Sequence, residues 1–325
     1  MKQAVNILML GGAKRVSMAR MIKRAGTRLG MAVNLFSYEL TSEVPIAEVA
    51  TVVKGLRWND PDIMDHLHTV VEENRIDILL PFVDPAVEIA IHYASADASV
   101  WTPGGTDAKM SALMFNKIEA DALFHKLGFP LPSNPQYEPV EGDIIAKPCF
   151  GSASKGIRIL SKAEYEQLAG SSEAGTYLFQ KYIAHRKEYT VDCYVASDGE
   201  VVCAVPRERI AVSGGEVTET ETIHDSEIEN ASHRILKALQ LRGPVTLQFL
   251  RDTDTSGDSR ALLMEINPRL GGGAVCSVHA GADIPLYMLS DFAGLPLKQD
   301  VPWRPGTRIC RYPCLLYTSP SPRDA

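Results

Sequence analysis

The order of apolar segments constrains the fold most strongly, because it changes character part-way along the chain. Up to residue 102, apolar runs at 5–10, 32–40, 76–83 and 99–102 alternate with amphipathic segments that predict helices. Such alternation is typical of a parallel sheet with helices on both faces. After about residue 144 strand-like runs predominate, with one helix expected near 225–241. The sequence therefore predicts an α/β unit followed by an α+β unit.

The junction between these units contains one long expected helix. It runs from about residue 106 to 127 and ends at the Gly-Phe-Pro-Leu-Pro segment 128–132, which combines two helix-ending residue types. An earlier helix is expected to begin at Asp60-Pro61, an N-cap followed by proline. The final segment 314–325, "CLLYTSPSPRDA", reads as a translated sequencing adapter, and a natural Ser/Pro tail is the alternative.

Composition limits the partners and the compartment. The 325 residues are 45% hydrophobic and carry a net charge of −7, which favours neither nucleic acid nor an anionic membrane surface. No apolar run is long enough to span a bilayer, and the first twelve residues read as a strand, not a signal peptide. The six cysteines form no C-x-x-C pair, so we expect reduced thiols in a cytoplasmic protein.

The strand that ends with Glu265 and Asn267 carries an unusual set of polar groups. Residues 261–264 are apolar, and the chain then reads Glu-Ile-Asn-Pro-Arg followed by three glycines. Because residues i and i+2 of a strand point to the same face, the two side chains present several oxygens to one place, which suits Mg²⁺. Arg269 would lie beside the metal, where a cation neutralises a transferring phosphoryl group. An ordinary polar strand end is the alternative.

The segment 146–160 predicts two strands joined by a loop of small residues. Lys147 lies in an apolar strand, where an ammonium group is costly unless it meets an anion. The loop from Gly151 to Gly156 can bring backbone N–H groups close to phosphates, because no large side chain intervenes. It lacks the residue order of a Walker A loop. A flexible hairpin with a solvent-seeking lysine is the alternative.

Two other segments hold candidate ligands. Gln248 lies in the apolar strand 243–250, and antiparallel pairing with the next strand would place it near Glu265 and Asn267 as a third oxygen donor. A glutamine satisfied by the backbone is the alternative. Glu188, in a segment of alternating polarity, could accept ribose hydroxyl groups, whereas the solvent face of a sheet is the alternative.

Other chemistries find no support in the spacing. The turn "LGGAKR" lacks the G-x-G-x-x-G pattern, so Glu39 at the end of the second expected strand does not indicate NAD binding. The histidines show no zinc-binding spacing, and no G-x-S-x-G or Cys/His pattern indicates a nucleophile. Direct phosphoryl transfer, in which positioning and electrostatics do most of the catalysis, fits this absence.

Five segments, taken in chain order, resemble the ATP-grasp superfamily, and particularly the synthetase units of the carbamoyl-phosphate synthase large subunit. They are "FNKIEADALFHKLGFPLP", "IIAKPCFGSASKGIRIL", "FQKYIAHRKEYTVD", "TLQFL" and "MEINPRLGGG". The resemblance implies a Rossmann-like, pre-ATP-grasp domain over residues 1–108. It implies an ATP-grasp domain over 109–313, with a lid subdomain at about 144–180 and a larger subdomain built on an antiparallel sheet.

The resemblance also implies roles for individual residues. Those implied to bind ATP are Lys117, Lys147, Gly151, Ser152, Ser154, Gly156, Gln180, Lys181, Ile183 and Glu188. The implied Mg²⁺ ligands are Gln248, Glu265 and Asn267, a set that also suits Mn²⁺. Arg269 and Lys147 are the implied catalytic residues. Many relatives have an acidic residue in the hinge where this chain reads Gln-Lys-Tyr-Ile, so Lys181 is expected to contribute only its backbone.

The implied activity is that of an ATP-dependent ligase, which converts a carboxylate to an acyl phosphate and joins it to an amine or other nucleophile. One alternative is a non-catalytic ATP-binding subunit, which need not keep Glu265, Asn267 and Arg269 together. Another is a bicarbonate-phosphorylating unit, which would need partners because the chain has one ATP-grasp region and no glutaminase motif. Small-molecule substrates and a homodimer are expected. Arg207 and Arg209 either contact an anion in the acceptor site or pair with glutamates.

Overall fold

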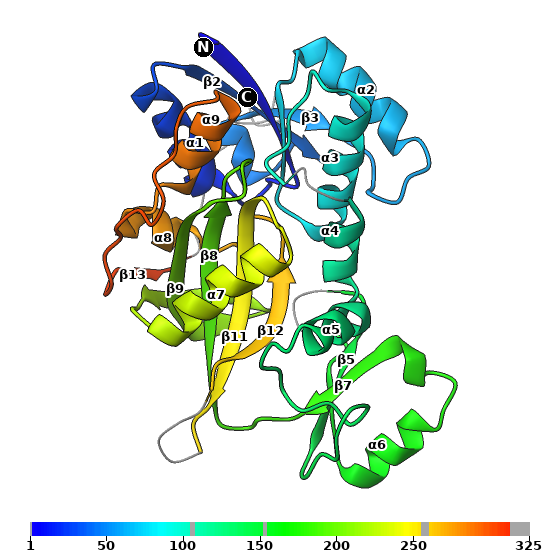
Figure 1. The fold of residues 1–325 in the computed structure, drawn as a ribbon. Helices are drawn as coiled ribbons and strands as arrows, with labels where there is room; N and C mark the ends of the chain where they lie inside the picture. The colour runs from blue at the N-terminus through cyan, green and yellow to red at the C-terminus, as the bar shows by residue number, and fades with distance from the viewer. Residues whose placement is uncertain (1, 105–107, 152–154, 255–259, 313–325) are drawn as a thin grey trace, which may run out of the picture.

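The computed structural model describes residues 2–104, 108–151, 155–254 and 260–312. The expected adapter-derived tail and two of the loop residues, Ser152 and Ser154, lie outside this range. Two larger sheets and one small sheet organise the described residues (Figure 1). Both sequence expectations for the fold class, a parallel α/β unit followed by an antiparallel α+β unit, are confirmed.

The first unit is a parallel sheet of four strands in the order β3-β2-β1-β4. Its strands are β1 (Ala4–Leu10), β2 (Ala32–Glu39), β3 (Thr51–Lys54) and β4 (Ile78–Pro81). Its helices are α1 (Val16–Arg28), α2 (Ile63–Asn74) and α3 (Asp84–Ala96), with a 3-10 turn η1 (Pro45–Glu48). Alternate residues of β1 pack into two different hydrophobic cores, so both faces of the sheet are covered.

Three details of this unit differ from the sequence prediction. Strand β3 was not predicted from the sequence, because its four residues are too few to show a periodic pattern. The strand expected at 99–102 is only a parallel bridge between Trp101 and Ile78. The helix expected from 106 to 127 is two helices, α4 (Ala108–Phe115) and α5 (Lys117–Lys126). Asn116 separates them, because its side chain accepts hydrogen bonds from two N–H groups in the first turn of α5.

The largest sheet has six strands in the order β12-β11-β8-β9-β10-β13, and each neighbouring pair is antiparallel. The strands are β8 (Arg186–Val195), β9 (Val201–Ser213), β10 (Glu216–Thr222), β11 (Gly243–Asp252), β12 (Leu262–Asn267) and β13 (Arg308–Cys310). The helices are α7 (Ser226–Ala238), α8 (Val275–Ala280) and α9 (Ile284–Phe292). One core packs this sheet against α5 and α7, and another joins it through α9 to the parallel sheet.

The smallest sheet, in the order β6-β5-β7, forms a unit that projects from one end of the molecule (Figure 1). It consists of β5 (Ile144–Pro148), β6 (Arg158–Leu160), α6 (Lys162–Ala169), η2 (Ala174–Thr176) and β7 (Tyr177–Lys181). We call residues 144–181 the small-sheet unit. Among the described residues of this unit, its own hydrophobic cluster has three buried members, Ala146, Leu160 and Leu168. Because this cluster is much smaller than the cores elsewhere in the molecule, the small-sheet unit is expected to open locally more readily than they do.

Among the described residues, no helix is both long enough and apolar enough to cross a membrane.

Candidate active site

The expected metal ligands come together on the hairpin of β11 and β12. Gln248 pairs directly with Glu265 in the antiparallel register, and Thr246 pairs with Asn267. This confirms the pairing on which the third oxygen donor depended. Asn267 is buried, while Gln248 and Glu265 are partly exposed. Two amide oxygens and one carboxylate at a strand end match the donors that a hard cation such as Mg²⁺ prefers.

The small number of carboxylates in this set has a chemical consequence. The described residues contain no group of three or more His, Cys, Asp or Glu placed to hold a metal ion. A site with a single carboxylate leaves much of the charge of a divalent cation uncompensated. Phosphate oxygens of a nucleotide would supply the missing negative charge, because Mg²⁺ is commonly bound by one or two carboxylates together with substrate phosphates.

Arg269 links the β11–β12 hairpin to the parallel-sheet unit. Its Nε donates to Asp84 Oδ1 at 2.5 Å, and a terminal nitrogen donates to Asn267 Oδ1 at 3.3 Å. Asp84 is the first residue of α3. Sequence analysis did not single out Asp84, because an aspartate followed by proline at the start of a helix reads as an ordinary helix start.

Lys147 lies at the centre of a buried polar network. Its ammonium group donates to Gln180 Oε1 at 2.8 Å, and the Gln180 amide donates to Asp121 Oδ1 at 2.7 Å. Asn134 donates to the other oxygen of Asp121 at 2.8 Å. The network connects β5, β7 and α5, and it fixes the ammonium group of Lys147 beneath the small-sheet unit.

Burial changes the protonation of this network. It lowers the pKa of Lys147 to about 8, although the carboxylates of Glu265 and Asp121 act in the opposite direction. Burial likewise raises the pKa of Asp121, against the hydrogen bonds from Asn134 and Gln180. A buried lysine without a directly bonded carboxylate is a good receptor for an anion. Asp121 is a residue that sequence analysis missed; its position one helical turn after Lys117 was the available signal.

Lys117 and the glycine loop lie at the rim of the same site. Lys117 is the first residue of α5; its ammonium donates to the carbonyl of Gly151 at 2.7 Å, and its backbone N–H donates to Cys149 at 3.0 Å. Gly151 and Gly156 adopt φ angles of +113° and +75°, which L side chains rarely adopt. Other residues at these two positions would therefore be strained.

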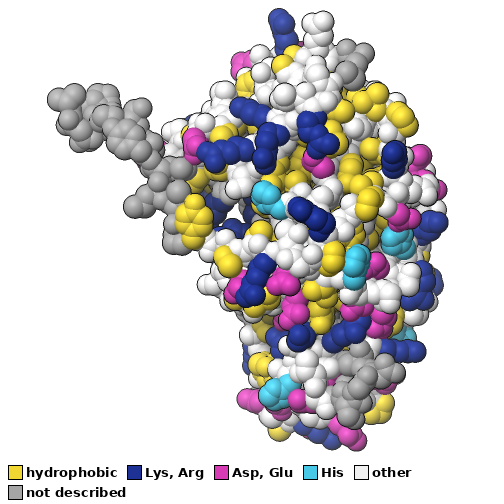
Figure 2. All heavy atoms as spheres, turned by 90° about the vertical axis from the view of Figure 1, so that its left-hand side faces the viewer, with side chains coloured by type: hydrophobic (Ala, Val, Ile, Leu, Met, Phe, Trp, Pro, Cys, Tyr) yellow, Lys and Arg dark blue, Asp and Glu magenta, His cyan; other side chains and the backbone are white. Residues whose placement is uncertain are grey.

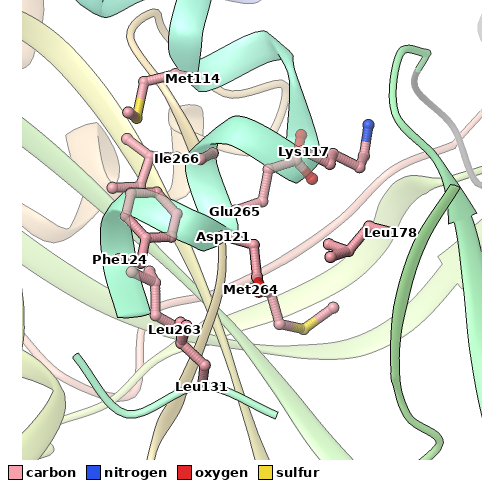
Figure 3. Close-up of a pocket in the computed structure, with 11 residues that line it drawn as sticks. Met114, Lys117, Asp121, Phe124, Leu131, Leu178, Leu263, Met264, Glu265 and Ile266 are labelled. Atoms are coloured by element: carbon pink, nitrogen blue, oxygen red, sulfur yellow. The ribbon is translucent and has the colours of Figure 1, made fainter. Parts of the chain in front are cut away.

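A small cavity extends inward from this rim, between α5, β7 and β12. Figure 3 shows Lys117 and Glu265 at one end of the lining, and Phe124 with Leu131 at the other. Leu178 and Met264 also line the cavity. The lining combines apolar side chains with charged ones, but the free volume is only about 10 Å³, so the cavity would have to widen to admit a nucleotide base.

The expected hinge residues lie at the end of β7 and just after it. The side chain of Gln180 is buried in the lysine network, whereas that of Lys181 is exposed. The backbone N–H of Lys181 donates to Ser133 at 2.6 Å, so it already has an acceptor within the chain. Ile183 is buried, and its carbonyl accepts from Arg186 at 2.8 Å.

Glu188 lies between two arginines. Its carboxylate accepts from Arg186 Nε at 2.9 Å and lies 3.4 Å from Arg209 Nε. Burial lowers the pKa of Arg209, although Glu188 opposes the shift. A ribose hydroxyl that bonds to Glu188 would therefore share its carboxylate with these two guanidinium groups. Arg209 therefore pairs with a glutamate, which is one of the two alternatives that the sequence left open for it.

Arg207 supports the glycine segment that follows Arg269. Its guanidinium is fully buried and donates to Asp192 at 2.7 and 3.3 Å, and Ser277 donates to the same carboxylate at 2.6 Å. A Cβ atom on Gly273 would lie 2.6 Å from the Arg207 guanidinium. Arg207 is therefore a structural residue, and the alternative in which it contacts a substrate anion is wrong, because the side chain is enclosed.

Comparison with known proteins identifies the fold. The protein-family model described as "ATP-grasp in the biosynthetic pathway with Ter operon" matches residues 174–312. No curated protein matches the sequence.

Solved structures match over most of the chain. The biotin carboxylase domain of Hydrogenobacter thermophilus 2-oxoglutarate carboxylase, determined as a dimer with MgADP, ADP and bicarbonate, is 16% identical, with a TM-score of 0.70 over 92% of this chain and 71% of that one. Campylobacter jejuni biotin carboxylase is 18% identical, with a TM-score of 0.70 over 90% and 72%. Staphylococcus aureus N5-carboxyaminoimidazole synthetase with ADP is 14% identical, with a TM-score of 0.71 over 92% and 80%. The resemblance to the ATP-grasp superfamily is confirmed at the level of the fold.

Proposed function

We propose that this chain, which has the ATP-grasp fold, is an ATP-dependent ligase that activates a carboxylate as an acyl phosphate and transfers the acyl group to an amine or another nucleophile. The observation that carries the proposal is the meeting of Lys117 and Glu265 at one small cavity, with the buried ammonium group of Lys147 close enough to interact electrostatically with both. A carboxylate of the proposed cation site and two ammonium groups that could bind phosphates thus lie close together.

ATP is proposed to bind with its base against the apolar lining of the cavity, which would widen as the small-sheet unit moves, and with its phosphates beside Lys117 and Glu265. Leu178 and Met264 would contact the base, and the hinge residues Gln180, Lys181 and Ile183 would border it. Glu188 would meet the ribose. Lys117 and Lys147 would hold the phosphates, together with the loop that contains Gly151, Ser152, Ser154 and Gly156.

Gln248, Glu265 and Asn267 are proposed to hold Mg²⁺, or Mn²⁺ in its place. When bound, the cation would neutralise charge on the phosphoryl oxygens. Arg269 would bind the transferring phosphoryl group from the other side, and its bond to Asp84 would keep the guanidinium in place.

The proposed reaction has two steps. An oxygen of the substrate carboxylate attacks the γ-phosphorus of ATP, the bond to the bridging oxygen breaks, and ADP leaves. The amine then attacks the acyl carbon, phosphate leaves, and the amine loses a proton. Lys147 and Arg269 would stabilise the negative charge that accumulates in the first step. Closure of the small-sheet unit would keep water away from the acyl phosphate.

A second candidate is phosphorylation of bicarbonate itself. Its support is that the H. thermophilus biotin carboxylase domain was determined with bicarbonate bound. A homodimer is part of the proposal, since the same structure is a dimer. The alternative is a chain that binds ATP without catalysing a reaction, and for such a chain no turnover is expected.

The test is ADP release from Mg²⁺-ATP in the presence of pooled amino acids, other carboxylates or bicarbonate. Hydroxylamine is added to trap the acyl phosphate as a hydroxamate. Carboxylate-dependent ADP and hydroxamate, both lost in Glu265→Ala, would establish the ligase and identify the acid. ADP release with bicarbonate alone would support the second candidate. Nucleotide binding without turnover on every acid would refute the ligase proposal.

A further inference from the structure

A group of arginines surrounds Gly272, beyond Arg269 along the chain. Arg15 lies in the turn between β1 and α1, and a Cβ atom on Gly272 would lie 2.8 Å from one of its terminal nitrogens. Arg311 approaches the same residue, because its guanidinium donates to the Gly272 carbonyl at 3.3 Å. Segments from the two ends of the chain thus meet at the glycine segment that follows the proposed phosphoryl-binding arginine.

The counterions around these guanidinium groups are few. Arg311 donates to Glu216 at 3.0 Å, and Arg15 lies 3.9 Å from the other oxygen of the same carboxylate. Arg269 is paired with Asp84. Three guanidinium groups therefore share two carboxylates, which leaves a net positive charge.

Arg15 is the least satisfied of the three. Its side chain is only 17% exposed, and within the described part of the chain no acceptor lies within hydrogen-bond distance of its guanidinium nitrogens. Burial lowers the pKa of Arg15, and the nearby Arg269 and Arg311 lower it further, against Glu216. A largely buried guanidinium that lies 3.9 Å from its carboxylate is only weakly compensated, and a bound anion would stabilise it.

The surroundings favour the approach of an anion although the chain as a whole is acidic. Figure 2 faces the side of the molecule on which α1, α8 and β13 lie, and basic side chains gather there over the parallel-sheet unit. A local positive surface raises the concentration of anions near it.

We propose that Arg15 and Arg311 form a binding site for an anionic group of the acid substrate, beside Arg269. This inference rests on the proposed function and assigns a substrate class to it: an acid whose carboxylate, or a second carboxylate or phosphate, contacts Arg15. The guanidinium fork binds carboxylate and phosphate oxygens in pairs, which would also orient the acid. Glu216 is then the internal competitor, since it occupies the cations when no substrate is bound.

The experiment measures anion binding without requiring turnover. The full chain is titrated with acetate, succinate and inorganic phosphate by isothermal calorimetry, with and without Mg²⁺-ADP. Arg15→Met is expected to weaken binding of the preferred anion at least about tenfold. Glu216→Gln is expected to strengthen it severalfold, because the competing carboxylate is gone. Arg24→Met, on the exposed side of α1, is the matched control and should change nothing.

Thermal unfolding separates this role from a structural one. Because the Arg15 guanidinium is largely buried and its contact with Glu216 is a weak one at 3.9 Å, the melting temperature of free Arg15→Met should be unchanged or higher, whereas loss of a strong structural contact would lower it. The affinities for acetate, succinate and phosphate show whether the site prefers a carboxylate or a phosphate.

Equal anion affinity in the wild type and Arg15→Met, weaker binding in Glu216→Gln, or no anion binding by the wild type would overturn the inference. If Arg15→Met fails to fold, the Glu216→Gln titration still decides. Absence of Mg²⁺-ADP binding with anion binding intact would instead count against the proposed function.

Discussion

Replacement of Lys147 by methionine tests the electrostatic account of the site most directly. The pKa of Lys147 is lowered from 10.5 to about 8 by burial. The folded protein therefore binds fewer protons than the unfolded chain between these two values, and stability contributed by this group increases as the pH rises. Below pH 8 the lysine is charged in both states, and its burial destabilises the ligand-free protein.

The size of the effect follows from the shift. At about 1.4 kcal/mol per pKa unit, the buried ammonium costs roughly 3 kcal/mol at neutral pH. Between pH 7 and pH 9.5 the wild type should gain about 2 kcal/mol relative to Lys147→Met, which has no titrating group at this position. The absolute stability of the variant also depends on Gln180 Oε1, which loses a donor. The loss of this donor does not depend on pH, so it does not affect the difference in pH dependence between the two proteins.

The assay is urea unfolding of both proteins at several pH values from 7 to 9.5, without nucleotide. NMR of lysines labelled at Cε gives a direct check: the resonance that is missing in Lys147→Met should titrate near pH 8. Lys162→Met, an exposed lysine on α6, is the control and should follow the wild type at every pH. A constant difference in unfolding free energy between the wild type and Lys147→Met would show that the ammonium titrates normally, and the reasoning would be refuted.

Other perturbations test the remaining parts of the structure. Since ATP should bind to the protonated form of the buried lysine, its dissociation constant should rise about tenfold per pH unit above pH 8; calorimetry that shows no change up to pH 9.5 would contradict this. Arg207→Met should lower the free energy of unfolding in urea by about 3–5 kcal/mol, because it leaves the buried Asp192 unpaired. The added change Asp192→Leu should restore part of this stability. An equal loss in the double variant would show that Arg207 and Asp192 are not a buried ion pair. Gly243→Ala should lower the free energy of unfolding by more than about 3 kcal/mol, because φ is +70° and the new Cβ would lie 1.6 Å from a carbonyl oxygen. Gly128→Ala, at φ +72° with open space around it, should lower it by about 1 kcal/mol. Thermal unfolding measures both.

Local patterns in the sequence were sufficient for the elements that have a clear period. The alternation of apolar runs with amphipathic helices predicted the parallel sheet, and the i, i+2 spacing of Glu265 and Asn267 placed both side chains at one strand end. The pairing of Gln248 with Glu265 was predicted because the two strands are joined by a short connection. Register between neighbouring antiparallel strands is largely a local property.

Short elements and breaks were beyond these patterns. The four residues of β3 have no measurable period, and their strand conformation depends on parallel pairing with β2. The division of the expected helix at Asn116 depends on a side-chain cap, which competes with helix continuation in the same sequence.

The sequence by itself determined which chemical groups this protein has and the order in which they occur, because strand and helix periods and small-residue loops are local properties of the chain. Only the tertiary structure decided which charges are compensated. Asp121 joins Lys147 through Gln180, Asp84 joins Arg269, and Arg15 lacks a bonded acceptor among the described residues. The hydrogen bonds among them join residues 33 to 185 positions apart, and burial sets their strength. No local pattern records such distances, since they arise only when three sheets pack around one site.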